Sequence, residues 1–295
     1  MTIAASNGMK CGQLIEMGHV PFGTYPPTQF QAAVRAVGAR LPRVWLGLRI
    51  SGLLRHILKA TTHGPIDVTV LGQRMRLRLL DNACERRLMV TPQFFDPEEL
   101  DLLRGAMRRD FQFIDVGANV GTYTVFVGKL VGPGSRILAI EPQAQALERL
   151  RENLELNEVN AQIAPFAVGD AEGEVGFVVD SQNLGFTSIN LQRRGRGERH
   201  IVRLPVRRLI DLVREAGFER IDAMKVDIEG AEDIALLPFF EEAPQALWPK
   251  LLIVENNRAE WRRDCVAYLE ARGYRSRKVA GNVVLQRGEM LASVR

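Results

Sequence analysis

The chain has 295 residues, of which 46% are hydrophobic and 25% charged, a composition that excludes a fibre or a disordered chain. Its 39 basic and 35 acidic residues give a net charge of +4, which does not by itself indicate nucleic-acid binding. The three cysteines form no C-x-x-C pair, which argues against a zinc site or a disulfide framework and favours a reduced, cytoplasmic protein. We expect no secretory signal and no transmembrane helix, because no long uncharged apolar run is present.

The first 110 residues contain two zones. Residues 1–40 are rich in Gly, Pro, Thr and Ala, and this composition predicts an irregular, partly mobile arm. Residues 41–110 begin with a basic amphipathic helix over 44–60. Such a helix can lie on an anionic membrane surface, or it can pack against the main domain, and we favour the second interpretation.

A β-hairpin is predicted next in the extension over 41–110. The segments 66–71 and 74–79 alternate between apolar and polar residues, and a turn containing Gly72 lies between them. A short helix over 97–107 then leads into the main domain. These elements would form a small N-terminal α+β extension.

Residues 111–290 alternate between strand and helix signals, which predicts an α/β domain with a largely parallel sheet covered on both faces. Five strands are expected, at 111–116, 136–140, 161–168, 221–226 and 251–254. Five helices are expected, at 123–131, 143–156, 207–216, 231–240 and 260–272. The segments 274–278 and 283–286 predict a terminal antiparallel hairpin, whereas a dinucleotide-dependent dehydrogenase would end on another parallel strand.

A glycine-containing loop, Asp115-Val-Gly-Ala-Asn-Val-Gly121, follows the first strand. Gly117 allows a tight turn, and Gly121 would let the backbone approach a ligand. The spacing is G-x-x-x-G, so the pyrophosphate-binding G-x-G-x-x-G pattern is absent. Asp115 would repel a pyrophosphate but attract the ammonium group of a methionine moiety. The loop therefore predicts contacts to a cofactor from Asp115, Gly117, Ala118, Asn119 and Gly121.

Two further acidic positions extend this cofactor site. Glu141 and Pro142 end the second strand, about 24 residues after Gly117, where a carboxylate can accept both hydroxyls of a ribose. Asp170 ends the third strand. Its side chain could reach an adenine amino group, or it could cap a turn, and the pattern leaves both alternatives open.

Taken together, these motifs resemble those of the FkbM-type methyltransferases. The resemblance extends from about Phe113 to Glu255 and is carried by Phe113–Thr124, Glu141-Pro142, Asn153–Asn157, Ala167–Asp170, Gly185–Ser188 and Lys225–Glu232. It implies a class I methyltransferase (Rossmann-like) sheet, S-adenosylmethionine as the methyl donor, and an acceptor hydroxyl on a sugar, a lipid-linked molecule or a small natural product. The first 110 residues match this family only loosely.

The block Lys225-Val-Asp-Ile-Glu-Gly230 follows the fourth strand, at the sheet edge where open α/β sheets bind ligands. Asp227 or Glu229 could accept the proton of an acceptor hydroxyl, and Lys225 could lower the pKa of that hydroxyl. The same acids could instead stabilise the loop and the start of the next helix. We favour a catalytic role for Asp227 and a structural role for Glu232.

A metal ion is an alternative for the same region. Asp227, Glu255 and Asn256 follow two neighbouring strands and could offer oxygen ligands to Mg²⁺, as in catechol-type O-methyltransferases. A bound Mg²⁺ would acidify the acceptor hydroxyl. Polar residues at strand ends are common in this fold, so the metal is the less favoured hypothesis.

Residues 180–204 form an insertion between the third and fourth strands. It could be an extended loop with solvated charges, or a lid whose arginines between 193 and 199 bind a phosphate or carboxylate. His200 could act as a base, although a single histidine in a loop is more often only solvated.

The sequence also bears on other classes of function than a methyltransferase. A nucleotide-cofactor oxidoreductase is disfavoured by the G-x-x-x-G spacing and by the terminal hairpin. A non-catalytic domain that binds a partner or a membrane through 44–60 is disfavoured by the intact Asp115, Gly117, Gly121 and Glu141. Nucleic-acid methylation is disfavoured because the chain has no Asn-Pro-Pro-Tyr-type base pocket and no basic patch with interleaved aromatic residues.

Overall fold

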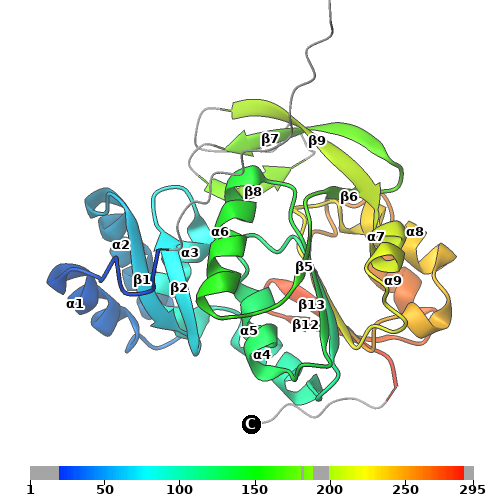
Figure 1. Ribbon diagram of the computed structural model, residues 1–295, viewed down its shortest axis with the longest axis horizontal. Helices are drawn as coiled ribbons and strands as arrows, with labels where there is room; N and C mark the ends of the chain where they lie inside the picture. Colours follow the sequence, from blue (N-terminus) through cyan, green and yellow to red (C-terminus); the bar gives the residue numbers. More distant parts are fainter. Residues whose placement is uncertain (1–19, 181–182, 189–198, 289–295) are drawn as a thin grey trace, which may run out of the picture.

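The computed structural model describes residues 20–180, 183–188 and 199–288. Its centre is a seven-stranded sheet in the order β12-β13-β11-β10-β3-β4-β5 (Figure 1). These strands are β3 (Gln112–Val116), β4 (Arg136–Ile140), β5 (Gln162–Ala164), β10 (Ala223–Val226), β11 (Leu251–Glu255), β12 (Arg275–Val279) and β13 (Asn282–Gln286). Strands β5, β4, β3, β10 and β11 are parallel, and β13 runs antiparallel to β11 and β12. The expected α/β class I methyltransferase sheet with a terminal antiparallel hairpin is therefore confirmed.

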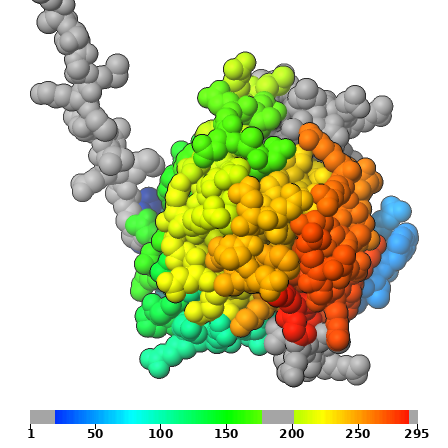
Figure 2. Space-filling model, turned by 90° about the vertical axis from the view of Figure 1, so that its right-hand side faces the viewer, coloured from blue at the N-terminus to red at the C-terminus, as the bar shows by residue number. Residues whose placement is uncertain are grey.

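Helices cover both faces of this sheet, because its strands carry apolar side chains on both sides. One face packs against α7 (Leu209–Glu215), α8 (Glu232–Glu242) and α9 (Cys265–Glu270) through a single buried apolar cluster. Figure 2 shows these helices as a continuous yellow-to-orange layer. The opposite face packs against α4 (Pro97–Ala106), α5 (Thr122–Leu130) and α6 (Ala144–Leu156).

A second, four-stranded sheet was not predicted. It has the order β6-β9-β7-β8 and consists of β6 (Ala167–Gly169), β7 (Gly173–Asp180), β8 (Asn183–Ser188) and β9 (Arg199–Arg208). The expectation of one strand over 161–168 was wrong, because Pro165 has no N–H to continue the ladder and the chain changes sheet there. Strands also replace much of the loop expected over 180–204, while the arginines at 193–198 lie outside the described residues.

The N-terminal region is more ordered than its composition predicts. It contains α1 (Gln29–Gly38), α2 (Trp45–Thr61), β1 (Pro65–Val70), β2 (Gln73–Arg78), α3 (Ala83–Val90) and the short η1 (Pro92–Phe94). The irregular arm expected over 1–40 was wrong for 29–38, because Thr28 and Gln31 form a capping box that starts α1. The hairpin β1–β2 has the predicted place, and α3 was not predicted. The apolar residues of this region share one core with the neighbouring face of the large sheet.

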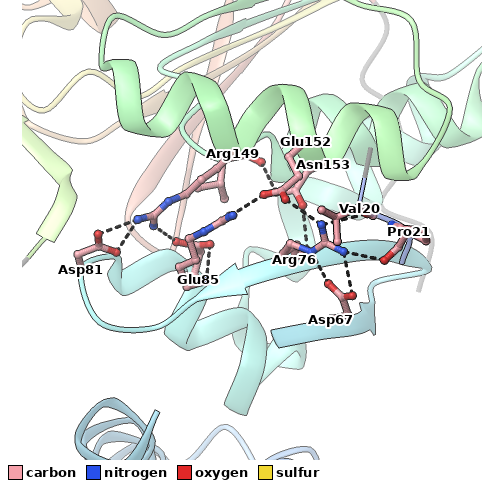
Figure 3. A network of polar contacts seen from close by, with 11 residues as sticks. Val20, Pro21, Asp67, Arg76, Asp81, Glu85, Arg149, Glu152 and Asn153 are labelled. Carbon is pink, nitrogen blue, oxygen red and sulfur yellow. Dashed lines mark hydrogen bonds and ion pairs between the residues drawn. The ribbon is translucent and has the colours of Figure 1, made fainter. Parts of the chain in front are cut away.

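Buried ion pairs attach the N-terminal region to α6 (Figure 3). The Arg76 guanidinium donates to Asp67 at 2.7 and 3.0 Å and to Glu152 at 2.9 Å. Arg149 donates to both carboxylate oxygens of Asp81, at 2.9 and 2.7 Å, and to Glu85 at 2.5 Å. Arg76 and Arg149 are both buried, so these contacts fix how the hairpin and α3 lie against α6.

Two asparagines in the Asn153–Asn157 motif continue this attachment. Asn153 accepts from the Arg76 N–H at 2.9 Å and donates to the Val120 carbonyl at 2.9 Å. Asn157 accepts from the Arg74 N–H at 2.9 Å and donates to the Arg74 carbonyl at 2.6 Å. The motif therefore joins the hairpin to α6 and to the glycine loop.

Candidate active site

A cavity of about 250 Å³ lies at the carboxyl ends of the parallel strands, as expected for an open α/β sheet. Its walls come from the glycine loop, from the ends of β4, β10 and β11, from β6, and from α3 of the N-terminal region. The predicted site residues that line it are Asp115, Gly117, Ala118, Asn119, Glu141, Pro142, Lys225, Asp227, Glu229 and Glu255. Among the described residues, Gly121, Asp170 and Asn256 are not part of this lining.

Both glycines of the loop adopt positive φ, and both lie so close to neighbouring residues that a side chain at either position would clash. Gly117 has φ +78°, and an added Cβ would lie 1.9 Å from the Asp227 carbonyl oxygen. Gly121 has φ +86° and precedes α5, where a Cβ would lie 2.5 Å from Leu150 of α6. Gly121 therefore lets the loop pack closely on α6, and its expected contact with a ligand stays a prediction.

Asp115 presents a carboxylate with one oxygen still free to accept. Its Oδ2 accepts from the Thr124 hydroxyl at 2.6 Å, while its buried Oδ1 has no hydrogen-bond partner among the described residues. The side chain is 1% exposed, and burial raises its pKa even though the Lys225 charge acts in the opposite direction. A buried acceptor without a partner is costly, so this oxygen suits a ligand that donates hydrogen bonds.

Glu141 lies on the other side of the glycine loop. Its two carboxylate oxygens accept from the N–H groups of Asn119 and Gln143, each at 2.9 Å. Burial raises its pKa to about 7, and the two backbone donors only partly offset that effect. Each oxygen keeps a second lone pair, so Glu141 can accept from two hydroxyl groups of a bound molecule.

Lys225 and Asp227 form an ion pair at the end of β10, with Nζ and Oδ2 3.0 Å apart. Burial by itself lowers the pKa of Lys225, but the Asp227 and Asp115 carboxylates outweigh burial and raise it. The ammonium group also lies 5.0 Å from the centre of the Tyr123 ring, a cation–π distance. Lys225 is therefore a fixed cation in the floor of the cavity.

The carboxylates of Asp227, Glu229 and Glu255 lie within 4.8 Å of one another. Burial and repulsion from Asp227 raise the pKa of Glu255 to about 9. Burial works against Asp227 ionisation as well, but Lys225 and a hydrogen bond from Glu255 lower the pKa of Asp227. Asp227 is therefore the more acidic carboxyl of the pair. Asn256, the third predicted metal ligand, is replaced in this group by Glu229.

Glu232 shows the structural role that was favoured for it. Its Oε1 accepts from the N–H groups of Ile228 and Gly230, each at 3.1 Å, and its Oε2 accepts from the Trp261 indole at 2.7 Å. The side chain is fully buried beneath the loop that carries Asp227. Glu232 therefore holds this loop in place from below.

Several lining residues were missed because they come from the N-terminal region. Cys84 and Arg87 of α3 line the cavity, as does Asp96, which accepts from the Tyr123 hydroxyl at 2.9 Å. Asn82, the N-cap of α3, donates to the Asn119 side chain at 2.8 Å and so connects α3 to the glycine loop. No local motif in the first 110 residues predicts these contacts, because they depend on how α3 packs against the main domain.

Comparison with known proteins places the chain in a family. The methyltransferase FkbM domain matches residues 115–276, more than half of the chain, and the chain belongs to this family. Methyltransferase sdnD of Sordaria araneosa is 26% identical over 54% of this chain and 80% of its own length. Methyltransferase 1 of Beauveria bassiana is 27% identical over 42% of this chain and 56% of its own length.

The AMB antimetabolite synthetase AmbE of Pseudomonas aeruginosa is 27% identical over 43% of this chain, and the match spans only 8% of AmbE. Solved structures are more distant in sequence. The O-methyltransferase of Bacillus cereus in complex with SAH is 12% identical, with a TM-score of 0.43 over 87% of this chain and 97% of that one. TomG, an O-methyltransferase from Streptomyces achromogenes involved in tomaymycin synthesis, is 15% identical, with a TM-score of 0.40 over 64% of this chain and 80% of that one.

Proposed function

We propose that the cavity binds S-adenosylmethionine and that the chain transfers its methyl group to a hydroxyl oxygen of a sugar, a lipid-linked molecule or a small natural product. The observation that carries this proposal is the pair of acids on either side of the glycine loop. Asp115 keeps a buried oxygen that no described residue contacts by a hydrogen bond, and Glu141 keeps lone pairs on both oxygens. The family membership supports methyl transfer as the reaction.

The residues present fit this cofactor at both of its polar ends. The free Asp115 Oδ1 suits the ammonium group of the methionine moiety, because a cation satisfies a buried carboxylate oxygen. Glu141 would accept from the two ribose hydroxyls, and Pro142 and Phe166 supply apolar surface in the same cavity. When bound, S-adenosylmethionine supplies a methyl group on a sulfonium centre, the electrophile of the reaction.

Asp227 would then receive the proton of the acceptor hydroxyl. An oxygen that gains a methyl group while keeping its proton becomes a strong acid, so a carboxylate of low pKa is a sufficient base. Asp227 meets this requirement because Lys225 lowers its pKa, and 37% of its side chain is exposed. Lys225 stabilises negative charge that develops on the oxygen as the proton leaves.

A lysine takes the place of a metal ion in this proposal. Lys225 Nζ lies 3.0 Å from Asp227, and its positive charge offsets part of the negative charge of the neighbouring carboxylates. In this proposal Asp227 accepts the proton without a bound Mg²⁺.

A methyl-transfer assay tests the reaction and the metal together. The chain is incubated with methyl-labelled S-adenosylmethionine and a panel of hydroxylated sugars, lipid-linked sugars and polyketide-like alcohols, with and without a chelator. We expect label on an acceptor oxygen, identified by mass spectrometry, and a rate within about twofold in chelator. Label on nitrogen or carbon would contradict the proposed acceptor atom, and activity that disappears in chelator and returns with Mg²⁺ would contradict the metal-free site.

A further inference from the structure

The start of α2 exposes a run of large apolar side chains, which we call the apolar edge. It consists of the N-cap residue Val44 and of Trp45, Leu46 and Leu48 in the first turn of the helix, with exposed fractions of 53%, 70%, 58% and 49%. This end of the helix is closely packed, because a Cβ on Gly47 would lie 2.0 Å from the Pro42 carbonyl oxygen. Figure 1 shows α1 and α2 at the outer edge of the molecule, away from the large sheet. The apolar edge therefore faces outward from a fixed backbone.

Helix α2 already buries a different face in the protein core. Gly47, Ser51 and Leu58 are buried on that face, and Leu58 has no exposed surface. Trp45, Arg49, Leu53 and His56 are spaced by three or four residues and share the opposite face, where Leu53 is 60% exposed. The helix thus packs on the rest of the chain, as the sequence favoured, and still carries a second, unpartnered apolar face.

Positive charge surrounds the apolar edge. Residues 20–66 contain six arginines and lysines and no aspartate or glutamate. Arg40, Arg43 and Arg49 are exposed and flank the apolar edge, and the Arg49 guanidinium lies 5.1 Å from the centre of the Trp45 ring. Exposed Trp and Leu side chains beside arginines, with no acid nearby in the chain, match the headgroup region of an anionic bilayer.

From this we infer that the apolar edge and its three arginines bind the surface of an anionic lipid membrane, with Trp45, Leu46 and Leu48 in the headgroup region. In the described part of the chain no helix has the length and apolarity to cross a bilayer, so the contact is peripheral. Helix α3 packs against both α1 and α2 and also supplies Cys84 and Arg87 to the cavity. A bound chain would thus hold one wall of its cavity close to the lipid surface, where a lipid-linked acceptor is concentrated.

Vesicle binding tests this inference without any methyl donor, so its outcome is independent of the proposed reaction. The full chain is mixed with phosphatidylcholine vesicles and with vesicles in which about a third of the lipid is phosphatidylglycerol. We expect the partition coefficient to be at least about tenfold higher for the anionic vesicles and to fall as salt is raised. Equal partition into both kinds of vesicle, or no binding to either, would overturn the inference.

Two pairs of variants show whether the binding surface is the one described. Arg43→Glu/Arg49→Glu should lower the partition coefficient about tenfold or more, whereas Arg275→Glu/Arg277→Glu should leave it within about twofold. Both pairs change the net charge equally, and Arg275 and Arg277 are exposed on β12. Trp45→Ser/Leu46→Ser should also weaken binding about tenfold, with Leu130→Ser, a 51% exposed leucine on α5, as its control.

Melting temperatures measured for every variant separate lost binding from lost folding. A response to Arg275→Glu/Arg277→Glu as large as that to Arg43→Glu/Arg49→Glu would overturn the inference, because binding would then follow net charge alone. A second result would overturn the inference and assign the apolar edge to a contact between two copies of this chain. In that case the unchanged chain would bind no vesicles and would form a dimer in size-exclusion chromatography, and Trp45→Ser/Leu46→Ser would dissociate the dimer.

Discussion

Two groups of charged side chains, one around the buried Arg76 and Arg149 and one around the buried Lys225, differ in how completely their carboxylates are hydrogen-bonded. In the group between the hairpin and α6, seven of the eight carboxylate oxygens of Asp67, Asp81, Glu85 and Glu152 accept from an arginine or a backbone N–H. The eighth, Glu152 Oε2, lies 2.7 Å from Arg78 Nη1 in an ion pair. In the cavity, Asp115 keeps an oxygen without a partner in the described part of the chain, and Asp227 and Glu255 lie beside Lys225 with pKa values shifted in opposite directions. The comparison indicates that the first group stabilises the fold, whereas the second is arranged for a ligand.

The largest predicted effect is the loss of stability in Arg149→Met. The variant leaves the buried Glu85 without its guanidinium, and we expect the free energy of unfolding to fall by about 3 to 5 kcal/mol. Arg104→Met, which breaks an exposed pair with Asp101, should cost less than about 1 kcal/mol. Denaturant unfolding measures both. A loss in Arg149→Met no larger than in Arg104→Met would remove the structural role of the network.

Asp227→Asn tests the cavity group. Loss of the proton acceptor should lower kcat about 100-fold, which is about 2.7 kcal/mol, with a much smaller change in stability than in Arg149→Met. Glu229→Gln, in the same loop, is the matched variant and should retain most of the activity. A larger loss in Glu229→Gln than in Asp227→Asn would assign the proton to Glu229 instead.

The raised pKa of Glu141 predicts a smaller effect, a pH dependence of ligand affinity and of stability whose direction can be stated. Burial raises this pKa from 4.5 to about 7, so Glu141 loses its proton in the folded chain only as the pH rises through about 7. The ionised form accepts from both ribose hydroxyls, and we therefore expect the affinity for S-adenosylhomocysteine to rise a few-fold between pH 6 and 8. Without ligand, the buried charge makes the folded chain less stable as the pH rises from about 4.5 to 7. In Glu141→Gln the affinity trend, measured by calorimetry, should be absent. The fall in stability, measured by thermal unfolding, should be smaller but not abolished, because burial also raises the pKa of Glu255. An affinity trend that persists in this variant would assign it to another group.

Those parts of the fold and the site that depend on local patterns could be predicted from the sequence. The strand–loop–helix around Gly117, the acid at Glu141 and the block Lys225–Glu232 are short motifs on neighbouring strands, and the parallel sheet brings them together. The second sheet was missed because a single residue, Pro165, ends one strand and lets the chain leave the large sheet.

Contacts between residues far apart in the chain could not be predicted. Arg76 pairs with Glu152, and Asn82 pairs with Asn119, and neither pair has a periodic signal. The lining residues on α3 depend on such pairs. The packing role of Gly121 was missed for the same reason, because only the structure shows that Leu150 of α6 lies where a side chain at this position would be.

The central claim is that Asp115 and Glu141 hold S-adenosylmethionine in the cavity. Titration calorimetry of the full chain with S-adenosylhomocysteine tests it most directly, with NAD as the control ligand. We predict saturable one-to-one binding of S-adenosylhomocysteine, no binding of NAD, and an affinity at least about tenfold weaker in Glu141→Ala. A folded chain that binds no S-adenosylhomocysteine, or that binds NAD equally well, would contradict the account.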